Sequence, residues 1–416
     1  MESLKPVRGT QDVLPQESRI YRKVEETAYK VAQRYGFDEI DIPIFEFSEV
    51  FSRTLGDSSD IVTKEMYTFV DKGGDTITLR PEGTAGVARA FISNGLQQSL
   101  PLKLFYKGPM FRYERPQKGR RRQFRQVGVE VLGVSSYQAD VEIISLASNF
   151  LKELNLENDI TLELNTLGDH DSRQLYKVRL LDYLDKYKNE LSKDSLNRLR
   201  KNPLRILDSK DPRDRSIVDN APKIIDSLNH DSKQFFENLC DGLEKLNISF
   251  KHSTNLVRGL DYYCHTAFEF TSTNLGAQGT VLAGGRYDGL INQMGGPNTP
   301  GIGWAAGIER LALLTKMENK KIRPIAVIPT NQENYIDALV IAEKLRKNGF
   351  NIELGYNGSA KKRMKKANEN NCIAAILLGK KEIKNNIVIL KDMDSGAQQE
   401  ISQLKLEKHL DMYKII

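Results

Sequence analysis

KLFYKGPMFRYERPQKGRRRQFRQVGVEVLG, residues Lys103 to Gly133, is the stretch that decides the fold. Two segments of extended character flank a polar loop, Pro116 to Arg122, and this order predicts a β-hairpin. Side chains alternate between the two faces of a strand, so Met110, Arg112 and Glu114 share one face of the first arm. The hairpin therefore carries an arginine and a carboxylate on the same side.

The second arm alternates valine with polar or small residues. Its apolar face consists of Val127, Val129 and Val131. The opposite face carries Gln126 and Glu130, and Gly128 between them is expected to leave a gap large enough for a ligand to approach the sheet. This face therefore combines an arginine, an amide and a carboxylate around a glycine, which suggests a binding surface for a zwitterionic or phosphorylated ligand. The alternative is the solvated face of an ordinary hairpin, and the hairpin alone does not decide between them.

The segment FRYERPQKGRRRQF, Phe111 to Phe124, closely resembles motif 2 of the class II aminoacyl-tRNA synthetases, and of the histidyl enzymes in particular. The resemblance implies that this hairpin binds ATP, the amino acid and the acceptor end of tRNA. The implied residues are Arg112 and Arg120 for ATP, Gln126 and Glu130 for histidine, and Glu114, Arg115 and Gln117 for the acceptor stem. Arg112 would also act in catalysis, against the α-phosphate and the amino acid carboxylate.

Length and composition set outer limits. A chain of 416 residues suggests about three domains, and 39% hydrophobic with 28% charged residues allow large cores. The net charge of +6 allows a polyanionic partner without requiring one. Three scattered cysteines and five histidines show no ligand spacing, so neither a disulfide framework nor a dedicated metal site is expected. Without a signal peptide or an apolar run of membrane length, we expect a cytoplasmic protein with no membrane contact.

The N-terminal region predicts a long helix and an interrupted strand. PVRGTQD at Pro6 to Asp12 resembles the start of histidyl-tRNA synthetases, with one extra residue after the proline. An apolar stripe predicts a helix over Gln16 to Tyr35, which Gly36 ends. The strand expected over Asp38 to Phe47 contains Pro43, which cannot donate to a ladder and should lie at an edge or an interface. The order resembles motif 1, which implies a homodimer.

The segment TLRPEGT, Thr78 to Thr84, predicts a sharp turn just before a helix. Glu82 and Thr84 are then held at the helix start, where a carboxylate and a hydroxyl can bind an ammonium group. The alternative is a plain capping turn, since both residue types are common there. The match to the RPEGT peptide of the histidyl enzymes favours binding of the histidine substrate.

The segment LVRGLDYY, Leu256 to Tyr263, resembles a signature peptide of the histidyl enzymes. Arg258 is planar and permanently cationic, so it suits the spreading of negative charge as a phosphate is attacked, and the resemblance makes it a catalytic residue. Tyr262 and Tyr263 supply rings and phenolic donors for an imidazole pocket. Cys264 and His265 follow directly. We expect them to be strand residues, because the implied mechanism needs no covalent enzyme intermediate.

Two glycine-rich segments complete the set. AGGRYDGL, from Ala283 to Leu290, predicts a turn that enters a helix, and it resembles the second histidyl peptide, which walls the amino acid site. GIGWAAGIER, from Gly301 to Arg310, resembles motif 3, which implies that Arg310 binds the terminal phosphate of ATP. Its small residues are expected to let the backbone approach the nucleotide.

The C-terminal part follows a charged linker after Lys316. Strands expected at Ala326 to Pro329 and Ala374 to Gly379 alternate with helices, which predicts a small parallel or mixed sheet. A basic run, Lys361 to Lys366, lies on a predicted helix and is a solvated face unless the chain binds RNA. Attached to a synthetase core, this unit resembles the anticodon-binding domain of the class IIa enzymes.

The resemblance implies an α+β fold: a class II antiparallel sheet flanked by helices, with a mostly helical insertion and a C-terminal α/β domain. The expected domains are 1–167 and 251–318 for the two parts of the catalytic domain, 168–250 for the insertion and 322–416 for the anticodon-binding domain. The implied activity is ATP-dependent activation of L-histidine and its transfer to tRNA(His), with Mg²⁺ arriving on ATP.

Two other classes of protein share some of these features. A regulatory, non-aminoacylating relative of this fold would be expected to lack the C-terminal domain and an intact Arg258 to Tyr263 peptide. A pure RNA-binding module would need neither RPEGT nor motif 3. The sequence leaves open whether the arginine cluster of the hairpin contacts RNA or solvent; its members are Arg121, Arg122 and Arg125.

Overall fold

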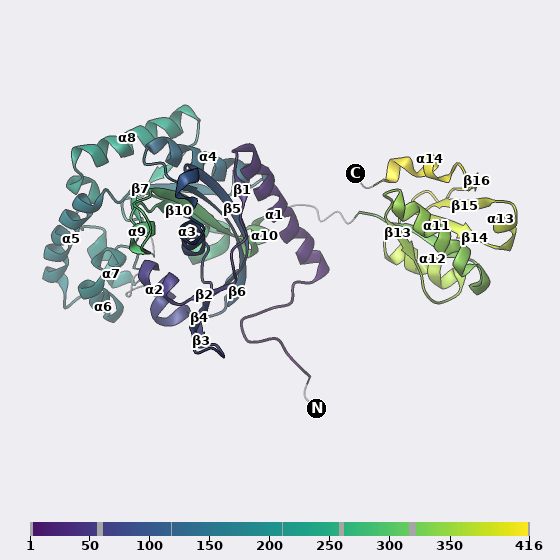
Figure 1. Cartoon of the computed structure of the whole chain (residues 1–416), viewed down its shortest axis with the longest axis horizontal. Coiled ribbons are helices and arrows are strands. Elements are labelled where there is room, and N and C mark those ends of the chain that lie inside the picture. The colour runs from purple at the N-terminus through teal and green to yellow at the C-terminus, as the bar shows by residue number, and fades with distance from the viewer. Residues whose placement is uncertain are drawn as a thin grey trace. The chain divides into compact units, whose positions relative to one another are not determined.

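The computed structural model of the chain describes residues 3–55, 61–117, 119–209, 211–257, 262–315 and 322–414, with the backbone alone at 277 and 278. The chain divides into two compact units, Met1–Met317 and Glu318–Ile416 (Figure 1). Arg258, the predicted catalytic arginine, lies outside the described residues. In the described part of the chain, no helix is long and apolar enough to cross a membrane.

The first unit is built on an eight-stranded sheet in the order β1-β5-β6-β11-β10-β9-β7-β8. The strands are β1 (Asp38–Glu39), β5 (Leu102–Phe111), β6 (Gln123–Leu132), β11 (Gly301–Gly307), β10 (Thr280–Arg286), β9 (Cys264–Thr271), β7 (Thr161–Thr166) and β8 (Lys251–His252). The six central strands are antiparallel, as predicted, while the two-residue edge strands β1 and β8 run parallel to their neighbours. Pro43 follows edge strand β1, where no ladder donor is required.

The predicted hairpin is present as β5 and β6. Its register places Leu104 opposite Glu130 and Tyr106 opposite Gly128, so even-numbered residues of both strands share one face. The three valines of β6 are buried on the other face, in a core formed with α1, α4, α8 and α10. The sheet therefore separates an apolar core from a face with polar side chains.

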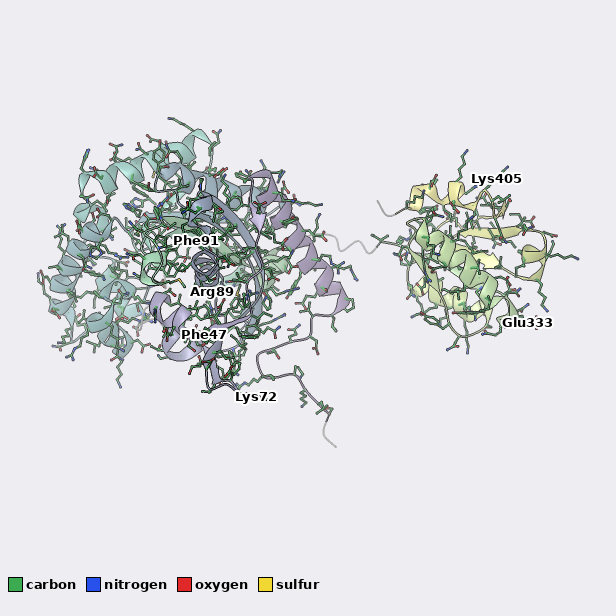
Figure 2. All side chains as sticks on the ribbon, in the orientation of Figure 1. Phe47, Lys72, Arg89, Phe91, Glu333 and Lys405 are labelled. Atoms are coloured by element: carbon green, nitrogen blue, oxygen red, sulfur yellow. The ribbon has the colours of Figure 1, made fainter. Side chains whose placement is uncertain are left out.

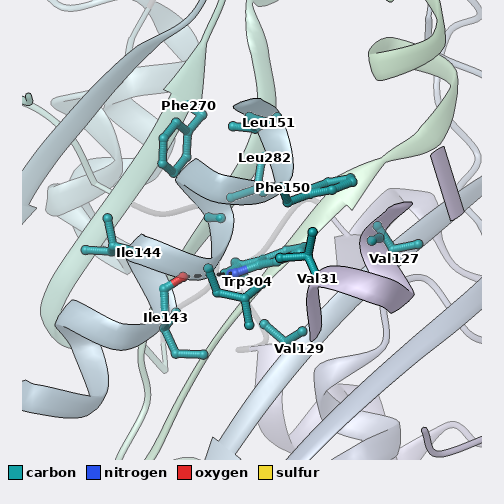
Figure 3. Close-up of a cluster of buried hydrophobic side chains, with 14 of the residues drawn as sticks. Val31, Val127, Val129, Ile143, Ile144, Phe150, Leu151, Phe270, Leu282 and Trp304 are labelled. Atoms are coloured by element: carbon teal, nitrogen blue, oxygen red, sulfur yellow. Dashed lines mark hydrogen bonds between the residues drawn. The ribbon is translucent and has the colours of Figure 1, made fainter. Parts of the chain in front are cut away.

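Helices α1 (Pro15–Arg34), α4 (Tyr137–Glu153), α8 (His230–Lys245) and α10 (Ile308–Leu314) supply that core. Figure 3 shows part of this core, where the Trp304 ring of β11 stacks on the Phe150 ring of α4. The centres of the two rings are 5.9 Å apart. The indole nitrogen donates to the Ile143 carbonyl at 3.2 Å, so the ring is buried without loss of its hydrogen bond. Gly36 adopts a φ of +76° directly after α1, which explains why the helix ends there.

The opposite face of the sheet is covered by α2 (Glu49–Leu55), α3 (Thr84–Ser93) and α9 (Leu290–Gln293). A small antiparallel sheet accompanies them, in the order β2-β4-β3. Its strands are β2 (Phe45–Phe47), β4 (Thr76–Leu79) and β3 (Tyr67–Val70). The helix predicted after the RPEGT turn begins at Thr84, as expected.

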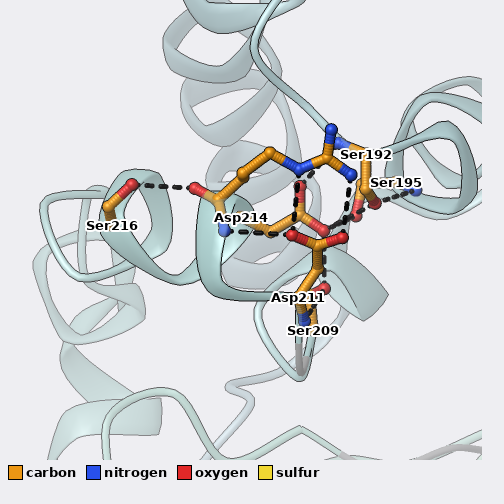
Figure 4. A network of polar contacts seen from close by, with 7 residues as sticks. Ser192, Ser195, Ser209, Asp211, Asp214 and Ser216 are labelled. Carbon is orange, nitrogen blue, oxygen red and sulfur yellow. Dashed lines mark hydrogen bonds and ion pairs between the residues drawn. The ribbon is translucent and has the colours of Figure 1, made fainter.

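Between β7 and β8 the chain forms a group of helices, in which α5 (His170–Leu184), α6 (Lys193–Lys201) and α7 (Pro212–Val218) precede α8. A buried carboxylate joins this group (Figure 4). Asp214 of α7 accepts hydrogen bonds from the Ser192 amide and hydroxyl and from the hydroxyls of Ser195 and Ser209, at 2.6–2.8 Å. These bonds outweigh burial and hold the pKa of Asp214 below its usual value.

The second unit has its own mixed sheet, in the order β13-β12-β14-β15-β16. Its strands are β13 (Ile352–Leu354), β12 (Ile325–Pro329), β14 (Ala374–Leu378), β15 (Ile387–Asp392) and β16 (Gln398–Ser402), and its helices are α11 (Tyr335–Lys347), α12 (Ala360–Glu369), α13 (Lys380–Lys384) and α14 (Leu406–Leu410). Side chains from α11 and α14 pack on one face of this sheet, and α12 packs on the other. The unit therefore buries a core of its own, as an independent domain must.

Candidate active site

A pocket lies on the polar face of the large sheet, over β6, β10 and β11, and holds about 210 Å³ of space. Most of the residues predicted to bind substrates line it together. They are Glu82, Thr84, Arg112, Glu114, Arg120, Gln126, Tyr262, Tyr263 and Arg310. Residues far apart in the sequence are thus joined in one site by the order of the strands.

One part of the pocket is acidic and begins at the RPEGT turn. The two carboxylate oxygens of Glu82 accept hydrogen bonds from the Thr84 and Ala85 amides at 2.8 Å, so Glu82 caps α3. Glu82 can therefore cap the helix and also bind an ammonium group, because each carboxylate oxygen retains a second lone pair. Burial raises the pKa of Glu82, although these hydrogen bonds oppose the shift.

Glu130 lies beneath the pocket wall and is only 1% exposed. Its carboxylate accepts a hydrogen bond from the Thr84 hydroxyl at 2.7 Å and another from the Tyr287 hydroxyl at 2.5 Å. Burial, and then the negative charge of Glu82, raise the pKa of Glu130 to about 8, against the hydrogen bonds that lower it. Two carboxylates close together in a buried site create a strong preference for a cationic ligand.

Aromatic rings surround this acidic region. The rings of Tyr262 and Tyr263 lie 4.6 Å apart, and Tyr262 meets Tyr287 edge-on at 5.8 Å. Gln126 also faces the pocket, and its side-chain oxygen is buried without a hydrogen-bond partner among the described residues. A buried acceptor in this state favours a ligand that brings a donor.

The other part of the pocket is cationic. Arg112 donates to the Pro81 carbonyl at 2.8 Å and lies over the Phe124 ring, while Arg120 pairs with Glu114 at 2.9 Å. Arg310 of α10 donates to the Thr280 carbonyl. Burial lowers the pKa of Arg310, and the charges of Arg120 and Arg112 lower it further. A bound anion would favour the charged form of Arg310 and so offset both effects.

The hairpin loop lies partly outside the pocket: Arg121 lines it, whereas Arg115, Gln117, Arg122 and Arg125 do not. Arg115 and Gln117 are exposed in the loop. The three arginines whose role the sequence left open each have partners within the protein. Arg121 pairs with Glu17, Arg122 lies 3.7 Å above the Tyr113 ring, and Arg125 pairs with Glu25.

The gap expected over Gly128 is not present, and that interpretation was wrong. A β-carbon at Gly128 would lie 2.3 Å from Cζ of Tyr106, so the space above this glycine holds the Tyr106 ring. Tyr106 was missed, although its position opposite Gly128 in the hairpin register could have revealed it.

Gly284 and Gly285 of AGGRYDGL lie inside strand β10, whereas Asp288 and Gly289 form the predicted turn, which enters helix α9 at Leu290. A β-carbon at Gly284 would lie 2.2 Å from the Gly303 carbonyl, so the strands approach too closely for a side chain. Arg286 is fully buried in ion pairs with Asp140 and Asp288, on a different side from the neighbouring Tyr287. Tyr287 therefore belongs to the site and was missed as a named binding residue.

Two glycines of motif 3 make room for neighbouring side chains, and Gly303, Ala305 and Gly307 of the same segment line the pocket. A β-carbon at Gly303 would lie 1.8 Å from a carboxylate oxygen of Glu130, and one at Gly301 would lie 2.2 Å from the Tyr287 ring. These glycines make room for side chains of the acidic region. Cys264 begins β9, as predicted, and burial raises the pKa of its thiol to about 12, which leaves it unreactive.

In the described part of the chain, no cluster of three or more His, Cys, Asp or Glu side chains could hold a metal ion. The carboxylates nearest the pocket arginines are already engaged. Glu114 pairs with Arg120, and Glu309 accepts the Arg125 amide at 3.0 Å.

The second unit contains a hollow of about 490 Å³ between β12, β13 and α12. Its rim includes Tyr356, which is 78% exposed, together with Lys362 and Lys366 of α12. The basic run is not uniformly solvated, because Arg363 is buried and donates to the Pro329 carbonyl at 2.8 Å. Only the lysines of the run are therefore available to a partner.

Comparisons with known proteins identify relatives along nearly the whole chain. A family profile described as "Histidyl-tRNA synthetase" matches residues 9–311, and one described as "Anticodon binding domain" matches residues 324–411. The chain is 57% identical over 411 residues to the histidine–tRNA ligase of Rhodospirillum rubrum and 51% identical over 410 residues to that of Gluconobacter oxydans, with 99% of each chain covered. It also resembles the solved apo histidyl-tRNA synthetase of S. aureus, with a TM-score of 0.83, 34% identity, and coverage of 98% of this chain and 99% of that one.

Proposed function

The chain belongs to the histidyl-tRNA synthetase family and is a histidine–tRNA ligase, and we propose that the pocket on its large sheet is the site of that reaction. One observation carries the proposal: a single pocket has the buried carboxylate of Glu82, with Glu130 beneath its wall, on one side and arginines on the other. Histidine offers an ammonium group and an imidazole, while ATP offers phosphates. The two charge regions match these two substrates.

Histidine is placed in the acidic region. Its ammonium group binds Glu82 and Thr84, and its imidazole lies among Glu130, Tyr262 and Tyr263. Gln126 accepts a hydrogen bond from the same substrate through its unpartnered oxygen. Arrival of a cationic group favours the ionised form of Glu130, whose pKa of about 8 leaves it mostly protonated in the empty pocket at neutral pH.

The first chemical step joins the histidine carboxylate to the α-phosphate of ATP. A carboxylate oxygen forms a bond to phosphorus as the bond to pyrophosphate breaks, giving histidyl-adenylate. No side chain needs to remove a proton, because the carboxyl group is already ionised at neutral pH. Catalysis therefore rests on positioning and on charge stabilisation by Arg112 and Arg258.

ATP binds along the cationic region, with Arg112 and Arg120 near its phosphates and Arg310 at the terminal phosphate. We propose that Mg²⁺ enters with ATP as part of that substrate, since Mg²⁺ is usually held by substrate phosphates with only one or two carboxylates. The engaged state of Glu114 and Glu309 gives no reason to assign a resident site to the ion.

In the second step, a ribose hydroxyl at the 3′ end of tRNA takes the histidyl group. Glu114, Arg115 and Gln117 of the hairpin loop are proposed to meet the acceptor stem. The loop position and exposure of Arg115 and Gln117 support this role, whereas Glu114 also holds Arg120 in place.

We propose four functional segments: 1–167 and 251–318 as the catalytic domain, 168–250 as an insertion near the acceptor stem, and 322–416 as the anticodon-binding domain. The aromatic and basic rim of the hollow in the last segment supports binding of nucleotides. Tyr356 offers a ring for stacking, and Lys362 and Lys366 offer charge for phosphates.

We also propose that the protein acts as a homodimer in the cytoplasm. The small sheet and the residue before it expose large apolar side chains, among them Phe47, which Figure 2 labels. The residues are Ile44, Phe45, Phe47, Phe69 and Val70, which are 43–64% exposed. A second copy of the chain would remove this patch from water. Sedimentation of Phe47→Asp against the unchanged protein tests the proposal, and an unchanged dimer would contradict this interface.

The experiment that tests the proposed site is ATP–pyrophosphate exchange with each amino acid in turn. We expect exchange with histidine alone. The same assay decides against a regulatory relative of this fold, which would give no exchange, and against a simple RNA-binding protein.

A further inference from the structure

Tyr106 fills a space that two glycines from different motifs leave open. It lies on β5, is 1% exposed, and faces Gly128 of β6. A β-carbon at Gly128 would lie 2.3 Å from Cζ of the ring, and one at Gly83 of the RPEGT turn would lie 2.1 Å from Cε2. Real β-carbons do not approach other atoms this closely. The ring is therefore held between the turn and the strand.

Neither glycine is required by its backbone conformation. Gly83 has a φ of −99°, and Gly128 lies in regular strand, so any residue could adopt either conformation. The Tyr106 ring leaves no room for a side chain at either position, and this explains why both are glycine. Two separate positions have no side chain so that one ring can lie between them.

The polar end of Tyr106 reaches the carboxylates of the site. Its hydroxyl is near Thr84 and Glu130 and is buried without a hydrogen-bond partner among the described residues, and burial followed by the charges of Glu130 and Glu82 keeps its pKa well above the usual value. Tyr106 does not line the pocket, and no substrate group is assigned to its ring. Any effect on a substrate must act through its neighbours.

We propose that Tyr106 is a positioning residue for histidine, acting as a rigid spacer that fixes the separation between the turn carrying Glu82 and the strand carrying Glu130 and Gln126. The inference rests on the proposed function of this pocket. A histidine substrate presents its ammonium group and its imidazole within a narrow range of distances, because only two rotatable bonds separate them. A fixed separation between the residues that bind these two groups therefore selects for histidine.

The test compares variants that remove or displace the ring. Tyr106→Leu removes the spacer, and we expect its histidine KM in pyrophosphate exchange to rise by about tenfold to a hundredfold, as for a misplaced substrate. Its ATP KM should stay within about twofold, because the arginines are not in contact with the ring. Tyr106→Phe keeps the spacer and should stay within about threefold of the unchanged protein in histidine KM.

A matched control is Tyr176→Phe. Tyr176 is equally buried but lies on helix α5. Its hydroxyl donates to the Pro222 carbonyl at 2.9 Å. It should leave both KM values unchanged. If Tyr106→Leu lowered kcat and left the histidine KM unchanged, Tyr106 would be a structural residue and the proposal would be wrong.

Gly128→Ala tests the spacer without changing Tyr106 itself. Its methyl group must displace the ring, so the histidine KM should rise. In the Tyr106→Leu background the same methyl group meets no ring and should have little further effect, which makes the two changes non-additive. Fully additive effects would overturn the proposal. If the unchanged protein showed no histidine-dependent exchange, the proposed function would fail instead, which separates the two outcomes.

Discussion

The Thr84 hydroxyl donates a 2.7 Å hydrogen bond to Glu130 and so joins the first residue of α3 to the middle of β6. Tyr287, directly after β10, donates to the other oxygen of the same carboxylate. Glu130 thus connects its own strand to two segments that lie 46 and 157 residues away in sequence. A buried carboxylate with this set of donors is positioned by the fold before any substrate binds.

The first prediction concerns the charge of that group. Glu130→Gln keeps the volume and removes the negative charge, and the lost interaction with a cationic substrate costs about 1.5–3 kcal/mol. Histidine KM in pyrophosphate exchange should therefore rise about tenfold or more, while ATP KM changes little. An unchanged histidine KM would remove Glu130 from the histidine site.

The second prediction follows from the pKa of Glu130, which is raised from 4.5 to about 8. Between these values the folded protein holds a proton that the unfolded chain has released. Stability must then fall as pH rises through this window, by up to about 1.4 kcal/mol per pH unit, and be independent of this group outside it. Glu130→Gln should flatten that fall in urea unfolding at pH 5.5, 6.5 and 7.5.

Glu49→Gln is the control for this measurement. Glu49 has a side chain that is 71% exposed and pairs with Arg53 on the surface of α2. Its replacement should leave the slope of stability against pH as it is in the unchanged protein. Equal slopes for Glu130→Gln and the unchanged protein would contradict the raised pKa.

The sequence predicted the parts of the fold that depend on local patterns. The β5–β6 hairpin, the start of α3 at Thr84 and the end of α1 before Gly36 follow from alternation, turn residues and capping. The valine face of β6 was predicted for the same reason, since a period of two places Val127, Val129 and Val131 together. The edge strands β1 and β8 were not predicted as parallel, because two-residue strands leave no pattern.

The packing of the site could not be predicted, because it depends on contacts across strands. Gly128 was expected to leave a gap for a ligand, whereas the Tyr106 ring occupies that space; likewise Tyr287 and Glu130 occupy the space beside Gly301 and Gly303. A glycine in a sequence shows only that no side chain is present. Which group enters the free volume is decided by the register of neighbouring strands.

The third prediction concerns Arg258, which is assigned on its motif alone. Arg258→Ala should lower the rate of pyrophosphate exchange about a hundredfold or more, the effect of removing one group that stabilises developing charge. ATP binding at equilibrium should weaken far less. Arg213→Ala, which changes a 67% exposed arginine, should leave the rate unchanged. Normal exchange by a folded Arg258→Ala protein would make this residue structural.

The fourth prediction tests the carboxylate within the insertion. Asp214→Ala leaves three serine hydroxyls and one amide without their acceptor, and should lower the free energy of unfolding by about 2–4 kcal/mol. Asp211→Ala, which removes an exposed helix cap paired with Arg213, should cost clearly less. Thermal unfolding measures both, and equal losses would argue against the buried network.

The fifth prediction separates the two halves of the reaction at the linker. Every residue assigned to adenylate formation precedes it, and the second unit has its own core. A chain ending near Asn319 should retain most histidine-dependent exchange but charge tRNA poorly, through a raised tRNA KM. The lost contacts include those of Lys362 and Lys366, which are expected to weaken with salt because they neutralise phosphates. Lys362→Ala with Lys366→Ala in the full chain should therefore reproduce part of the charging defect and leave exchange intact. If truncation lowered exchange and charging equally in a protein of unchanged oligomeric state, the second unit would support the catalytic domain rather than bind tRNA.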